Sequence, residues 1–220
     1  MKKLLMLVLT LSFMMVSISG PVMAKKVGDI KEGIFTDKNH KFSMAALDGW
    51  STKIGSSEKA PLRLTMLEKS YPVPQDFQGG GKEDFAQTPT IKVLVDTCSV
   101  SVEDFINNLS SHDYDSDQKK YFLKQLTLIK KPHEVQTSSD VTIQGEKAVI
   151  VNVRQAYTKE ISSTGSDRAS VINDYISGYI LYTVREGKVY VFTLCTEYKM
   201  ASNYATKWNQ LVNSIKFDVK

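Results

Sequence analysis

The chain has 220 residues, of which 42% are hydrophobic and 24% charged, an ordinary composition for a globular protein with its own core. Its 28 basic residues exceed its 24 acidic ones by only four. This balance argues against a nucleic-acid-binding protein, which would need a strongly basic domain.

The first 24 residues predict a cleavable signal peptide. Lys2 and Lys3 supply a positive start, an apolar run over residues 4–18 follows, and Val22-Met23-Ala24 places small residues where a signal peptidase cuts. A membrane anchor is the alternative, but crossing the hydrocarbon core takes about 20 apolar residues, and this run is shorter. We therefore expect a periplasmic or secreted mature chain of 196 residues, with a net charge lowered from +4 to +2 and no transmembrane segment.

Residues 25–33 are polar and predict a linker, so we expect a single domain over residues 34–220. Its first strands are predicted at residues 42–47 and 50–54, on either side of a turn at Asp48-Gly49. Residues 62–67 alternate between apolar and polar, which is typical of a half-buried strand.

A long irregular stretch over residues 71–88 follows, with two prolines and three consecutive glycines. Loops of this length inside a domain are uncommon and are often functional. The stretch holds three aromatic residues, Tyr71, Phe77 and Phe85, which we predict to form a contact surface. The alternative, equally compatible with the length of the loop, is that these rings attach the loop to the sheet.

The next predicted elements are a strand at residues 91–95 and a helix that begins at Ser101, because Ser three residues before an acid is typical of an N-cap. A second helix is predicted to end at Pro132. Residues 141–153 predict a hairpin that turns at Gly145-Glu146, and residues 157–169 predict a polar loop.

The last third of the chain predicts a hairpin and a helix. Residues 175–184 and 189–195 are two strands joined at Glu186-Gly187. An apolar stripe from Met200 to Ile215 predicts a helix, and residues 215–217 a short final strand. Strands in consecutive hairpins, interrupted and closed by helices, predict an α+β fold with an antiparallel sheet flanked by helices.

Two cysteines, Cys98 and Cys195, each end an apolar strand-like segment. An even number of cysteines in an oxidising compartment favours a disulfide. If the two strands are close in one sheet, their matching ends meet at bonding distance. We therefore predict a Cys98–Cys195 bridge, with two buried free thiols as the alternative.

Several short motifs resemble catalytic or ligand-binding sites but lack essential partners. Ser56 and Ser116 each begin a Ser-x-x-Lys motif without the other motifs of penicillin-recognising enzymes. Residues 79–82 resemble a phosphate loop without its first glycine and its final Ser or Thr. The alternating aspartates of residues 113–117 lack the glycine and glutamate of a calcium loop. We therefore expect no enzymatic activity, no cofactor and no metal.

Two segments together resemble the PsbP-like family. Residues 42–50 are similar to its opening strand, acidic-glycine turn and tryptophan, and residues 187–194 lead into a helix through Trp208 and the closing Ser214-Ile215-Lys216-Phe217. The resemblance covers nearly all of residues 34–220. It implies an α+β sandwich and a non-catalytic binding habit, without naming a partner or site residues.

We expect a monomeric, non-enzymatic binding or accessory protein of the bacterial cell envelope, whose partner is an unidentified envelope protein or small ligand. Two alternatives stay open. One is a carrier of a lipid or small ligand, if the helices stand off the sheet and leave a pocket. The other is an enzyme with an unrecognised site, for example at residues 71–88.

Overall fold

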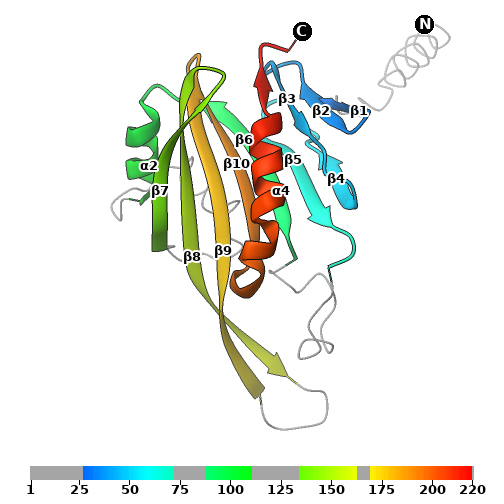
Figure 1. Cartoon of the computed structure of the whole chain (residues 1–220), viewed down its shortest axis with the longest axis vertical. Coiled ribbons are helices and arrows are strands. Elements are labelled where there is room, and N and C mark those ends of the chain that lie inside the picture. The colour runs from blue at the N-terminus through cyan, green and yellow to red at the C-terminus, as the bar shows by residue number, and fades with distance from the viewer. Residues whose placement is uncertain (1–26, 72–87, 111–133, 163–168, 220) are drawn as a thin grey trace, which may run out of the picture.

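Two antiparallel sheets and three helical segments make up the computed structural model, which describes residues 27–71, 88–110, 134–162 and 169–219 (Figure 1). The smaller sheet has the strand order β1-β2-β3-β11 and the larger sheet the order β4-β5-β6-β10-β9-β8-β7. The strands of the smaller sheet are β1 (Asp29–Lys31), β2 (Ile34–Asp37), β3 (Phe42–Ala45) and β11 (Lys216–Phe217). Those of the larger sheet are β4 (Trp50–Ile54), β5 (Leu62–Glu68), β6 (Thr90–Thr97), β7 (Glu134–Ile143), β8 (Glu146–Ser162), β9 (Ala169–Arg185) and β10 (Lys188–Glu197). The helical segments are α2 (Val102–Ser110), the short 3-10 helix η3 (Tyr198–Met200) and α4 (Ala201–Ser214). The predicted α+β class is confirmed.

Local interactions set the ends of several elements where the sequence predicts them. The backbone N–H of Asp104 donates to Ser101 Oγ at 3.1 Å, so Ser101 caps α2. Glu186 and Gly187 both have positive φ, 49° and 70°, which matches the twist of the hairpin between β9 and β10. Gln144 and Gly145, between β7 and β8, also both have positive φ, so this turn lies one residue earlier than predicted.

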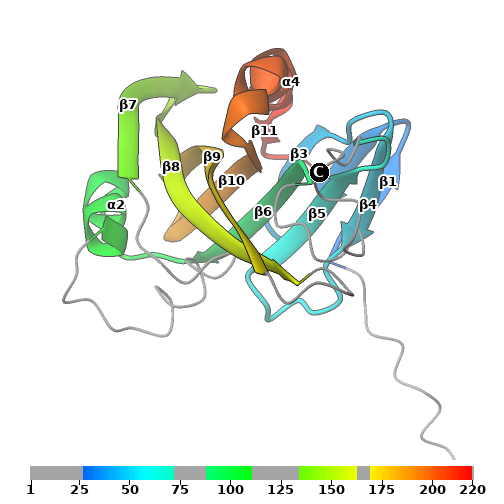
Figure 2. The same ribbon diagram turned by 90° about the horizontal axis from the view of Figure 1, so that it is seen from below.

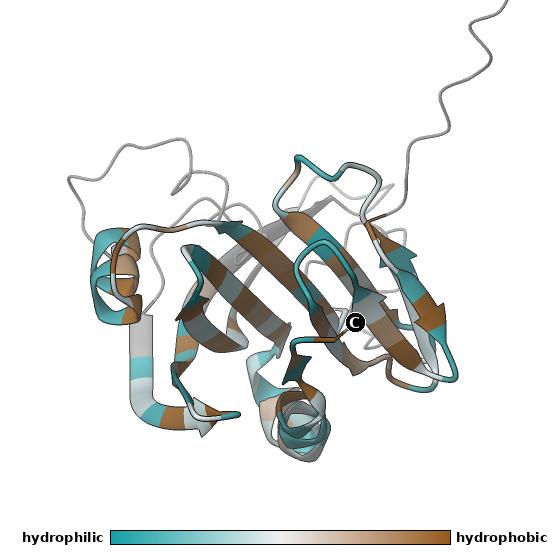
Figure 3. Cartoon of the chain, turned by 90° about the horizontal axis from the view of Figure 1, so that it is seen from above, coloured by the Kyte–Doolittle hydropathy of each residue, from teal (hydrophilic) through white to brown (hydrophobic). Residues whose placement is uncertain are grey.

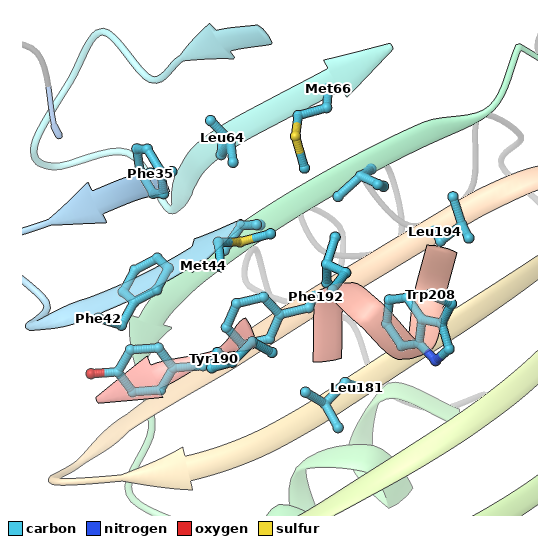
Figure 4. Packing of buried hydrophobic residues seen from close by; sticks show 14 of the residues in the cluster. Phe35, Phe42, Met44, Leu64, Met66, Leu181, Tyr190, Phe192, Leu194 and Trp208 are labelled. Carbon is cyan, nitrogen blue, oxygen red and sulfur yellow. The ribbon is translucent and has the colours of Figure 1, made fainter. Parts of the chain in front are cut away.

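The main core lies between the larger sheet and a layer made of α4 and the smaller sheet (Figure 2). Phe42 of β3 meets the rings of Phe35, Tyr190 and Phe192, each in an edge-on contact with centroids 5.8 Å apart (Figure 4). Trp208 of α4 stacks on Tyr179 of β9 at 6.0 Å. The strands of the larger sheet carry long hydrophobic stretches, whereas much of the outer surface of α4 is hydrophilic (Figure 3). One continuous core therefore joins both sheets and α4.

A second core covers the other face of the larger sheet. Val102, Phe105 and Leu109 are the buried side of α2. They pack with buried residues of β6, β8, β9 and β10, including Val151 and Val191. Strands β8, β9 and β10 are thus covered on both faces, which agrees with their long apolar runs. No helix within the described ranges is long and apolar enough to cross a membrane.

Two predicted loops contain strands instead. Val27 is only 2% exposed and residues 29–31 form β1, so much of the predicted linker at 25–33 belongs to the smaller sheet. An edge strand needs few apolar residues, which explains why its composition indicated a linker. Within the predicted loop at 157–169, residues 157–162 continue β8 and Ala169 begins β9.

The predicted Cys98–Cys195 disulfide is wrong, because neither cysteine is in a disulfide. Strands β6 and β10 are neighbours but antiparallel: Cys195 lies opposite Thr90, whereas Cys98 follows Thr97, which lies opposite Lys188. The cysteines therefore lie at opposite ends of the strand pair, about 25 Å apart at roughly 3.3 Å per residue. A disulfide needs its Cα atoms within about 7 Å.

We therefore expect two free thiols per chain. The denatured, unreduced protein should react with two equivalents of an alkylating reagent, and reductant should leave the melting temperature unchanged. In the folded protein Cys195 should react slowly, because burial raises its pKa to about 11 and keeps it as the thiol. Fewer than two reactive thiols in the denatured, unreduced chain would contradict this arrangement.

Candidate binding surface

The β8–β9 hairpin extends beyond the rest of the larger sheet (Figure 1). Both strands have 17 residues, whereas β7 and β10 have ten each. β10 ends with Glu197 opposite Ile176, and β7 begins with Glu134 opposite Arg154. Past these points, residues 156–162 pair with residues 169–175, and no other described strand pairs with them. We call these two segments the hairpin arm.

Two tyrosines and an arginine meet at the root of the hairpin arm. Tyr175 of β9 and Tyr198 of η3 are 42% and 43% exposed, and their rings meet edge-on at 6.2 Å. The guanidinium carbon of Arg154, on β8, lies 4.7 Å from the centroid of the Tyr175 ring and 5.7 Å from that of Tyr198. We call these three residues the tyrosine–arginine patch. It combines exposed aromatic area with a positive charge held over it.

The patch lies on the face of the sheet that α4 covers. Tyr175 and Tyr179 are four residues apart on β9 and therefore lie on the same face. Tyr179 stacks on Trp208 of α4, and its hydroxyl donates to the Ala201 carbonyl at 3.3 Å. The patch therefore lies just beyond the N-terminal end of α4 in space, where α4 no longer covers this face of the sheet.

A buried hydrogen bond fixes the chain next to Tyr198. The Tyr71 hydroxyl donates to Glu197 Oε2 at 2.9 Å, and Glu197, the last residue of β10, is buried. Burial, together with the Glu197 carboxylate, raises the pKa of Tyr71, so its hydroxyl stays a donor at physiological pH. The end of β10, and with it the start of η3, is thereby tied to the segment that follows β5.

The predicted contact surface is therefore wrong at Tyr71, which is only 9% exposed and faces Glu197. Its ring attaches the start of the 71–88 stretch to the sheet, the alternative that the sequence left open. Phe77 and Phe85 lie outside the described residues.

A second carboxylate, that of Glu68 on β5, attaches α4 to the sheet. Glu68 Oε1 accepts from Lys207 Nζ at 2.9 Å, and Glu68 Oε2 accepts from the Tyr204 hydroxyl. The Tyr204 ring meets Trp50 edge-on at 6.3 Å. Burial and the Glu68 carboxylate raise the pKa of Tyr204. Glu68 and Glu197 thus each bind a tyrosine hydroxyl and fix the position of the segments around them.

A cavity of about 670 Å³ lies at the other end of the sheet. Its walls come from the β6–α2 connection, α2 and the β9–β10 turn, and include Cys98, Val100, Phe105, Asn108 and Gly187. In the parts of the chain that the structure describes, no group of three or more His, Cys, Asp or Glu side chains could hold a metal ion. The aspartates of residues 113–117 lie outside those parts.

Sequence reasoning missed all three residues of the patch. Arg154 and Tyr175 come from two strands, and Tyr198 from the segment after a third, so no spacing along the chain marks them as neighbours. The available signal was weak: a tyrosine begins one predicted strand and another follows shortly after Cys195.

No family model and no curated protein matches the chain. Among solved structures, it is similar to cyanobacterial PsbP (CyanoP) from Synechocystis sp. PCC 6803, with 10% identity, coverage of 90% of this chain and 99% of that one, and a TM-score of 0.49. It is also similar to LpqN, involved in cell envelope biogenesis of Mycobacterium tuberculosis (13% identity, 80% and 82% coverage, TM-score 0.42). A protein of unknown function from Pseudomonas aeruginosa, PA94, matches with 13% identity, 74% and 94% coverage and a TM-score of 0.37. A PsbP protein is thus among the structural neighbours of the chain.

Proposed function

We propose that the protein is a non-enzymatic binding protein of the bacterial cell envelope, which holds a partner protein through the tyrosine–arginine patch. One observation carries this proposal: Tyr175 and Tyr198 expose about two fifths of their surface while their rings and Arg154 hold one another in place. Tyrosine and arginine are among the residues most enriched at binding hot spots. Rigid aromatic area also loses little conformational entropy on binding.

The neighbourhood of the patch favours binding over turnover. Glu197 directly precedes Tyr198, Glu68 lies on β5, and each of these carboxylates accepts a hydrogen bond from a tyrosine hydroxyl. Groups used in this way fix the position of η3 and α4. The envelope location in the proposal rests on the signal peptide predicted over residues 1–24.

The 670 Å³ cavity supports a second candidate function, a carrier of a small ligand. Its volume lies within the range of about 300–1,000 Å³ that is common for small-molecule sites. Native mass spectrometry of the purified protein separates the two candidates. A small molecule that co-purifies with the original chain and is lost in Phe105→Ala favours the carrier. If the protein acts only through the patch, no such bound molecule is expected.

Removing both exposed rings should abolish partner binding without unfolding the protein. We expect Tyr175→Ser/Tyr198→Ser to reduce capture of the partner from envelope extract at least tenfold, because two hot-spot side chains contribute about 1–2 kcal/mol each. The measurement is quantitative mass spectrometry of proteins captured on the immobilised chain, together with a thermal melt.

The matched control is Ile34→Ser, which removes an apolar side chain that is 49% exposed in the smaller sheet. It should leave capture unchanged. Equal capture by the patch variant and the original chain would disprove the proposed surface. A fall in melting temperature as large as that of a core variant would show that the two rings are structural.

A further inference from the structure

The patch residue Tyr198 lies on η3, a segment that does little to fix its own position. η3 has three residues, and none of them is buried. Its N-cap residue, Glu197, makes no side-chain capping hydrogen bond to the helix. A single turn of 3-10 helix is weak by itself, because so short a segment has few hydrogen bonds to offset the loss of conformational freedom. The position of the Tyr198 ring therefore depends on what holds the two ends of η3.

Hydrogen bonds from two tyrosine hydroxyls hold these ends. After the last residue of η3, the carbonyl of Ala201 accepts from the Tyr179 hydroxyl at 3.3 Å. Before its first residue, Glu197 Oε2 accepts from the Tyr71 hydroxyl at 2.9 Å. The second bond is the stronger one, because its acceptor is a carboxylate rather than a neutral carbonyl.

The Tyr71–Glu197 bond controls the end of β10. Both side chains are buried. Without the tyrosine hydroxyl, a buried carboxylate would lose its donor, and a charge in that position gains by moving out to water. Glu197 is also the last residue of β10 that pairs with β9, where it lies opposite Ile176. Its movement would open this end of the strand and carry the next residue, Tyr198, with it.

We propose that Tyr71 and Glu197 are positioning residues of the tyrosine–arginine patch. Their bond keeps the Tyr198 ring in edge-on contact with Tyr175 and within 5.7 Å of the Arg154 guanidinium carbon. Exposed contacts of these two kinds are weak, so the patch needs support from the buried bond to stay assembled.

This inference rests on the proposed function and adds a dependence to it. Partner binding would require two buried side chains that the partner does not touch. If their bond is lost, both exposed rings remain on the protein but are no longer held together. The partner would then have to order them on binding, and that ordering lowers the affinity.

Tyr71→Phe tests the positioning role, because it removes the hydroxyl and keeps the buried ring. In protein with isotopically labelled tyrosines, the Tyr175 and Tyr198 rings should give a nuclear Overhauser contact, since their centroids are 6.2 Å apart. We expect Tyr71→Phe to weaken this ring contact at least about twofold, and to lower partner capture from envelope extract at least about threefold. Glu197→Gln keeps an oxygen that accepts from the Tyr71 hydroxyl, so it should retain both.

The matched control is Tyr204→Phe, which removes the hydroxyl from the other tyrosine–carboxylate bond. Tyr204 donates to Glu68 from within α4, so its loss does not release the start of η3. The control should keep the ring contact and the capture of the original chain. A thermal melt accompanies both variants. A merely structural role of Tyr71 would lower the melting temperature in both and leave the ring contact of the folded protein unchanged.

An unchanged ring contact or unchanged capture in Tyr71→Phe would overturn the positioning role, and so would an equal loss in Tyr204→Phe. This failure is distinguishable from failure of the proposed function. Loss of capture in Tyr175→Ser/Tyr198→Ser, with an unchanged ring contact in Tyr71→Phe, would support the patch and reject the positioning role. Undiminished capture by Tyr175→Ser/Tyr198→Ser would reject the patch as the binding surface, while a weakened ring contact in Tyr71→Phe would still show that Tyr71 positions the ring.

Discussion

Replacing Asp37 by asparagine should destabilise the fold by about 3–5 kcal/mol, the usual cost of breaking one partner of a buried ion pair. Asp37 and Arg63 are both 0% exposed, and Arg63 Nε donates to Asp37 Oδ2 at 2.6 Å. Arg63 Nη1 donates to the carbonyls of Glu58 and Ala60 at 3.3 and 3.2 Å, so the guanidinium cannot move to water without breaking further bonds. The variant leaves a buried positive charge without a counter-charge. Denaturant unfolding measures the loss.

Asp29→Asn is the matched control, with the same chemical change in the same sheet. Asp29 pairs with Lys31 at 3.5 Å, and both side chains are exposed. Exposed pairs of this kind contribute about 0–1 kcal/mol. A loss in Asp37→Asn no larger than in Asp29→Asn would show that the buried pair contributes little.

The same carboxyl makes stability depend on pH in the acid range. Burial raises the pKa of Asp37, but hydrogen bonds from His40 and Arg63 and the charge of Arg63 outweigh it, so the pKa is lowered overall. A carboxyl with a lowered pKa stabilises the fold fully above its unfolded pKa of about 3.9, and this stabilisation is lost as pH falls through the lower, folded value. We therefore expect the original chain to lose stability more steeply than Asp37→Asn below about pH 4. Parallel slopes from pH 5 to pH 2.5 would contradict this assignment.

Replacing Phe42 by alanine should also cost about 3–5 kcal/mol, because a large buried ring leaves a cavity that its neighbours fill only in part. Phe42 is fully buried in the smaller sheet, and its ring contacts Tyr190 and Phe192 of β10 in the larger sheet (Figure 4). Because the contact crosses between the sheets, we expect one cooperative transition at lower denaturant rather than separate loss of the smaller sheet.

The control for Phe42→Ala is Ile34→Ala, a truncation in the neighbouring strand β2 at a side chain that is half exposed. It should cost no more than about 0.5 kcal/mol, as surface substitutions usually do. Two separate transitions in Phe42→Ala, or a loss below about 1.5 kcal/mol, would show that the sheets are only loosely coupled.

Features that depend on a few neighbouring residues were predictable from the sequence. The Ser101 cap, the turn at Glu186-Gly187 and the apolar stripe of α4 each arise from contacts within about four residues along the chain. The alternating strand at residues 62–67 is another such case, found as β5. Backbone conformation and side-chain periodicity are sufficient there, because no distant segment is needed to form them.

Features that depend on which strands become neighbours, and in which direction, were decided only by the tertiary structure. Cys98 directly follows β6 and Cys195 lies near the end of β10, but the antiparallel pairing of these two strands puts the cysteines far apart. Tyr71 lies at the start of a long predicted loop, yet its hydroxyl donates a hydrogen bond to Glu197, 126 residues later in the chain. Arg154, Tyr175 and Tyr198 become one patch only through the order β8-β9-β10. The physical reason is that strand pairing joins segments distant in sequence, and the energy of that pairing has no local signature.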